Sequence, residues 1–268
     1  MHLGRLLPLG LGDDVQAHAG DTAYRRTSTA KKKAIMRWLL GAGALLAAVQ
    51  HNAFAYLVPS LGVKNRFFPA TAPTHGNINI TDESAEISVW TSDGAKLRLE
   101  LQYPNSREWG AYLPHGLRDF CRLFCGLPIE ELVIEGLINN ALEFMNWANL
   151  LHSLTELRTL EVIGRGPIRP LFRALKHTPM LDLGHSDFNG PWPPPCDKLK
   201  TLSVQYADYL DGDIELLVAV LHRRAHLGAT RMERVELHMG TKNDESGFAE
   251  EMETYLSELE ELCPDISY

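Results

Sequence analysis

A short apolar phrase recurs in the C-terminal half of this chain, and it limits the folds that the chain can adopt. Its first, fourth and sixth positions are apolar in Ile129-Leu132-Ile134, Leu157-Leu160-Val162, Leu199-Leu202-Val204 and Met232-Val235-Leu237. Alternation between the last two apolar positions is typical of a β-strand that buries one face. A single strand of this kind cannot bury its apolar face alone. Its recurrence therefore predicts structural repeats that stack on one another.

The spacing of the phrase is typical of leucine-rich repeats, whose units contain roughly 20 to 29 residues. The fourth positions are Leu132, Leu160, Leu202 and Val235, with separations of 28, 42 and 33 residues. The separation of 42 divides evenly if Leu181 is the centre of a degenerate repeat. We therefore predict an α/β fold, an irregular leucine-rich-repeat solenoid with parallel strands on its concave face and helices outside. A generic domain of alternating strands and helices is the alternative.

Charge divides the chain into two regions. Residues 1–76 contain nine Lys/Arg and three Asp/Glu, a balance of +6, whereas residues 77–268 contain 17 and 31, a balance of −14. An acidic domain repels phosphate backbones, so we expect no nucleic-acid binding by the second region. An apolar fraction of 45% excludes a wholly disordered chain.

We interpret residues 1–76 as a basic, partly disordered extension and residues 80–268 as the repeat domain, with linker composition at residues 67–79. An apolar segment at residues 38–63 contains no Asp, Glu, Lys or Arg and exceeds the roughly 20 residues that span a bilayer. Three hypotheses are open for it: a membrane anchor, a secretory signal, and a helix that packs on the repeat domain or is poorly ordered. Gln50-His51-Asn52 near its centre argue against the anchor.

Periodicity predicts further elements around the repeats. Two alternating segments, Ile87–Trp90 and Leu97–Tyr103, predict a β-hairpin. We expect a C-terminal capping helix at residues 246–262, and another helix with Ile214, Leu217, Val218 and Leu221 on its buried face. A third helix is expected to bury Leu117, Phe120, Cys121, Phe124 and Cys125. Four cysteines without a CxxC pair favour a reducing compartment, the cytoplasm or nucleus, over the membrane or secreted alternative.

Strand alternation also predicts a binding surface. In each repeat strand the residues between the buried apolar positions face outward, and the concave sheet of a solenoid is its usual binding surface. The candidate protein-binding residues are therefore Glu131, Glu135, Thr159, Glu161, Ser203, Gln205, Glu236 and His238.

The sequence contains no pattern that predicts catalysis or a cofactor. His222 and His226 have the spacing of two helical metal ligands, but the glutamate of the H-E-x-x-H motif is absent and two arginines lie between them. No P-loop or G-x-S-x-G motif is present. We therefore predict a non-enzymatic protein without catalytic residues, metal ligands or cofactors.

The last roughly 180 residues resemble the leucine-rich-repeat region of fungal F-box proteins. The resemblance rests on residues 154–162, 196–202, 216–224 and 228–237, and on the closing Leu256, Leu259, Leu262 and Pro264. It implies a substrate receptor in which an N-terminal F-box docks the adaptor of a cullin-based ubiquitin ligase. No L-P-x-E/D opening of an F-box occurs in residues 1–76. We therefore expect an unidentified protein partner, with membrane contact through residues 38–63 as the alternative.

Overall fold

The computed structural model describes residues 72–81, 84–102, 113–138, 142–176, 194–240 and 245–268. The apolar segment at residues 38–63, the rest of the extension to residue 71, and Leu181 lie outside these ranges. The described strands are β1 (His75–Ile80), β2 (Ser84–Trp90), β3 (Lys96–Gln102), β4 (Glu131–Gly136), β5 (Thr159–Ile163), β6 (Thr201–Asp208), β7 (Arg234–Gly240) and β8 (Asp265–Ser267). The described helices are α3 (Leu113–Phe124), α4 (Phe144–Ser153), α5 (Arg169–Lys176), α6 (Asp213–His226) and α7 (Glu245–Leu262).

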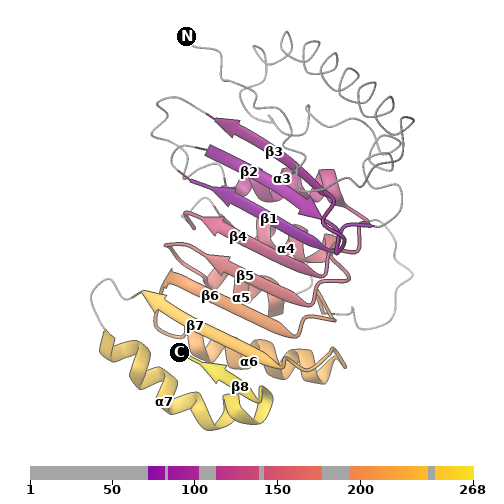
Figure 1. Cartoon of the computed structure of the whole chain (residues 1–268). Coiled ribbons are helices and arrows are strands. Elements are labelled where there is room, and N and C mark those ends of the chain that lie inside the picture. Colours follow the sequence, from indigo (N-terminus) through magenta and orange to yellow (C-terminus); the bar gives the residue numbers. More distant parts are fainter. Residues whose placement is uncertain (1–71, 82–83, 103–112, 139–141, 177–193, 241–244) are drawn as a thin grey trace, which may run out of the picture.

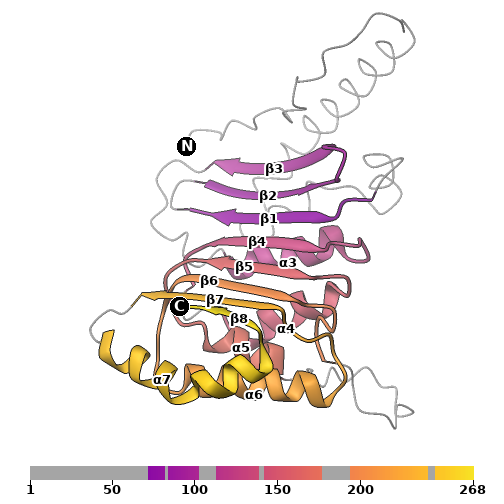
Figure 2. The ribbon, with the colours of Figure 1, turned by 60° about the horizontal axis from the view of Figure 1, so that its bottom comes forward.

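All eight strands form one sheet, in the order β3-β2-β1-β4-β5-β6-β7-β8. The strands from β1 and β4 to β8 are parallel, and from β4 onward each is joined to the next through a helix. The labelled helices lie on one side of the sheet (Figures 1 and 2). They also pack in sequence order, from α3 against α4 to α6 against α7. The predicted α/β class is therefore confirmed.

The fourth positions of the apolar phrase are neighbours across the sheet. Leu132 pairs with Leu160, Leu160 with Leu202, and Leu202 with Val235. All four side chains are fully buried, and Ile266 in β8 continues the same row. The periodicity thus predicted both the strands and the residues that they turn toward the helices.

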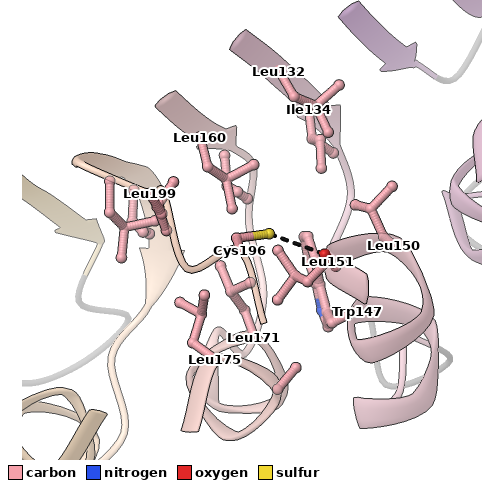
Figure 3. Packing of buried hydrophobic residues seen from close by; sticks show 14 of the residues in the cluster. Leu132, Ile134, Trp147, Leu150, Leu151, Leu160, Leu171, Leu175, Cys196 and Leu199 are labelled. Carbon is pink, nitrogen blue, oxygen red and sulfur yellow. Dashed lines mark hydrogen bonds between the residues drawn. The ribbon is translucent and has the colours of Figure 1, made fainter. Parts of the chain in front are cut away.

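The core lies between the sheet and the helices. Figure 3 shows leucines of β4 and β5 facing Trp147, Leu150 and Leu151 of α4 and Leu171 and Leu175 of α5. Trp147 has no exposed surface and is the largest of these side chains. The strand phrase supplies one wall of the core, and the amphipathic helices supply the other.

The sequence left open whether Leu181, which lies outside the described residues, divides the separation of 42 between Leu160 and Leu202. β5 and β6 are direct neighbours, with Leu160 opposite Leu202, so no strand centred on Leu181 lies between them. The 41 residues between these leucines include a helix, α5. One longer connection accounts for the spacing, because loop closure becomes only slowly more costly with length.

β1 was not predicted. It begins at His75 in the segment interpreted as a linker, and the expected boundary at residue 76 falls inside it. Nevertheless β1 lies between β2 and β4 and buries Ile78 and Ile80. Its remaining residues are His, Gly and Asn, which are uncommon in strands and typical of turns. The predicted hairpin is confirmed as the antiparallel pair β2 and β3.

The expected burial of both cysteines on α3 was wrong. Cys125 is exposed and Cys121 is only half-buried. The buried stripe of α3 contains Leu113, Leu117, Phe120 and Phe124, and Cys121 lies at its edge. The helix ends at Phe124, so Cys125 no longer follows the helical stripe.

Helix α6 has the buried face that periodicity predicted. Ile214, Leu217, Val218 and Leu221 of α6 are all buried. α7 ends at Leu262 as expected, but the chain continues into β8, so the helix is not the last element. Glu251 of α7 accepts hydrogen bonds from the backbone amides of Gly212 and Glu215, at 3.1 Å each, and so satisfies the amino end of α6.

Candidate protein-binding surface

The side of the sheet opposite the helices, which we call the helix-free face, contains all eight candidate residues. In Figure 1 the helices α3, α4 and α5 lie behind the sheet. Strand register arranges the outward residues in three rows: His75-Glu131-Thr159-Thr201-Arg234, then Asn77-Val133-Glu161-Ser203-Glu236, then Asn79-Glu135-Ile163-Gln205-His238. Glu131, Glu135 and His238 are exposed, Ser203 is buried, and the other candidates are half-buried. The structure therefore brings these residues together on a single surface.

The two ends of the helix-free face contain cations that pair with its acids. On β2 and β3, Arg98 lies 2.8 Å from Glu86 and 2.9 Å from Glu100. On β7, Arg234 contacts Glu236 of its own strand and lies 3.4 Å from Asp265 of β8. Exposed pairs of this kind contribute little stability, but they compensate the local charge.

The centre of the face lacks this compensation. On β1, β4, β5 and β6 the outward positions contain no Lys or Arg. Glu135 accepts a hydrogen bond from the Asn79 amide at 2.6 Å, and Glu161 accepts one from the Gln205 amide at 2.7 Å. A neutral amide orients a carboxylate without cancelling its charge. The centre of the face is therefore negative.

Apolar side chains alternate with these carboxylates. Val133 is opposite Glu161 in the register, and Ile163 is opposite Glu135. Both aliphatic side chains are half-buried, so each has surface available to a ligand. We call Glu131, Val133, Glu135, Glu161 and Ile163 the central acidic patch. Its chemistry suits a ligand that combines positive charges with an aliphatic side chain.

The contribution of the first three strands to this face was not predicted from the sequence. Asn77 and Asn79 of β1 extend it next to β4. His75 lies 3.4 Å from Glu131 and stacks on Trp90 of β2, with ring centroids 5.5 Å apart. The alternation of the asparagines with Ile78 and Ile80 was a signal for this strand.

The described residues contain no group of three potential metal ligands. The His222 ring does not face a metal site but lies 2.6 Å from a Glu258 oxygen across α6 and α7. Burial raises the pKa of the Cys196 thiol to about 12. A thiol with such a pKa is almost entirely protonated at neutral pH, so Cys196 is a poor nucleophile.

No protein-family model, no curated protein and no solved structure matches this chain. Among the helices that the structure describes, none has the length and apolar character needed to cross a membrane.

Proposed function

We propose that the chain is a non-enzymatic protein-binding module, built as an irregular leucine-rich-repeat solenoid, that holds its partner on the helix-free face. One observation carries this proposal: five parallel strands align their outward side chains in rows, and the middle of these rows has negative charge without compensating Lys or Arg. Such a surface binds by equilibrium complementarity and requires no reacting group.

The stacking of strands and helices in sequence order supports the solenoid part of the proposal. The resemblance to fungal F-box proteins suggests a more specific role as a substrate receptor of a cullin-based ubiquitin ligase. In that role the helix-free face selects the substrate, and residues 1–76 contact the ligase adaptor. The four thiols are unpaired, which favours the cytoplasm or nucleus as the site of action.

The test is affinity purification of the tagged full chain from cells, with mass spectrometry of the bound proteins. We expect Glu161→Lys and Glu236→Lys to reduce partner recovery at least tenfold, because each introduces a positive charge into the face. Glu250→Lys and Glu253→Lys on the exposed side of α7 are the matched controls. Recovery of the ligase adaptor would support the receptor role.

Two results would contradict the proposal. One is partner recovery that does not change in either face variant, since the partner would then bind elsewhere. The other is an equal loss in the α7 controls, which would indicate a general effect of charge. Denaturant unfolding of each variant should give an unchanged midpoint, so that loss of binding is not loss of fold.

A further inference from the structure

We infer that the central acidic patch is the docking site of the chain's own basic segment, residues 31–37, which occupies the face in competition with the partner. This inference concerns regulation of the proposed binding face and therefore rests on the proposed function. The segment reads Lys31-Lys32-Lys33-Ala34-Ile35-Met36-Arg37.

The chemistry of the segment is complementary to the patch. Four positive charges flank two adjacent aliphatic side chains, Ile35 and Met36. In the patch, the carboxylates of Glu135 and Glu161 flank the aliphatic side chains of Val133 and Ile163. Cations of the segment can thus approach Glu135 and Glu161, whose hydrogen bonds among the described residues come from amides, while the aliphatic groups bury apolar surface together.

The two regions of the chain have opposite net charge, as the segment and the patch do. The first 76 residues have a balance of +6, and the remainder has a balance of −14. At the ends of the helix-free face, Lys96, Arg98 and Arg234 already pair with acidic side chains, so less negative charge is left there for a second cation. The outward positions of β1, β4, β5 and β6 contain no Lys or Arg, and the carboxylates among them lie on β4 and β5, so the charge distribution directs a basic segment there.

The connection between segment and patch is long enough. Arg37 and His75 are separated by 37 residues. Even at the rise of an α-helix, about 1.5 Å per residue, 37 residues extend roughly 55 Å, which exceeds the total width of eight strands about 4.8 Å apart. The chain enters the sheet at β1, directly beside β4. A covalent tether keeps the segment near the patch and so raises its effective concentration there above that of a free peptide.

Carbodiimide cross-linking tests the contact in the full chain, because this reagent joins a lysine amine directly to a carboxylate. At low ionic strength we expect peptide mapping to recover Lys31, Lys32 or Lys33 joined to Glu135 or Glu161. The monomer should contain this product at all protein concentrations, since the contact is within one chain. The product should decline at 1 M salt, where the Debye length falls to about 3 Å.

Matched variants make the cross-linking result specific. Glu135→Gln together with Glu161→Gln should abolish the product, whereas Glu250→Gln together with Glu253→Gln on α7 should not change it. Products that map to α7 instead of the patch would overturn the inference. So would products found only in covalent dimers, because the segment would then dock on a second copy.

A competition measurement separates the inference from the proposed function. The probe is a labelled synthetic peptide of residues 29–39. We expect it to bind about tenfold more tightly to a full chain with Lys31→Glu, Lys32→Glu and Lys33→Glu than to the unaltered chain, because the variant leaves the patch vacant. Equal affinity would overturn the inference, whereas unchanged partner recovery in the Glu161→Lys variant would overturn only the proposed function.

Discussion

Arg224 of α6 donates a hydrogen bond to the backbone carbonyl of Cys196 at 3.0 Å, and both residues are buried. The thiol of Cys196 in turn donates to the carbonyl of Leu151 in α4, also at 3.0 Å (Figure 3). The loop that leads into β6 is therefore connected to two helices that are not neighbours. This buried polar contact holds the entry to β6 next to the core.

The Arg224 contact leads to a prediction about stability. The same guanidinium also donates to the carbonyls of Pro195 and Leu199, at 3.0 and 3.2 Å. Arg224→Met would leave buried carbonyls unpaired, so we expect it to lower the free energy of unfolding by about 3 kcal/mol. Denaturant unfolding measures this change. Arg223→Met at the exposed neighbouring position is the control and should cost less than about 0.5 kcal/mol. Equal effects of the two substitutions would contradict the structural role of Arg224.

The rate at which each cysteine is modified should depend on its burial. Burial raises the pKa of Cys196 to about 12, and its side chain is nearly inaccessible. Cys125 is exposed. At pH 8 we expect iodoacetamide to modify Cys125 rapidly and Cys196 only after unfolding, because the thiolate is the reactive form. Mass spectrometry of timed digests gives the two rates. Comparable rates in the native protein would show that the loop before β6 opens.

Gly164, which directly follows β5, should resist substitution. A Cβ atom on Gly164 would lie 1.8 Å from the carbonyl oxygen of Gly136 at the end of the neighbouring strand β4. Gly164→Ala must therefore separate two backbones, and we expect a loss of at least about 2 kcal/mol in the free energy of unfolding.

Gly94→Ala is the comparison for this substitution. Its added Cβ would meet no atom within 4 Å, although its φ of +89° disfavours alanine. We therefore expect a cost of about 1 kcal/mol from the backbone alone. A Gly94→Ala cost that equals or exceeds the Gly164→Ala cost in the same denaturant assay would show that the ends of β4 and β5 separate without difficulty.

Asp213 should make stability depend on pH. Burial raises the pKa of its carboxyl above the ordinary 3.8, although Arg169 donates to it at 2.8 Å. The folded protein then binds a proton more readily than the unfolded chain, so the stability contribution is present below pH 3.8 and is lost as pH rises through the raised pKa. Asp213→Asn removes this titration.

The measurement for Asp213 is the difference in free energy of unfolding between the unaltered chain and the Asp213→Asn variant, followed from pH 4 to pH 8. As pH rises, we expect the free energy of unfolding of the unaltered chain to fall relative to that of the variant. The opposite slope would mean that Arg169 stabilises the carboxylate by more than burial destabilises it.

Periodicity alone determined the parallel strands that contain the apolar phrase and the buried face of α6. Leu132 and Leu202 belong to strands because alternating side chains must reach one apolar layer, and this requirement is visible within a few residues. The same alternation placed Glu161 and its companions on the helix-free face, although it could not show whether they bind a partner.

The tertiary structure decided which segments are neighbours. β1 contains turn-forming residues and is held as a strand by pairing with β2 and β4. β6 pairs directly with β5, although the spacing in the sequence allowed a further repeat centred on Leu181 between them. The amide partners that orient Glu135 and Glu161 come from other strands. Pairing between distant segments depends on the free energy of the whole sheet, whereas periodicity reports only which side of a single segment is buried.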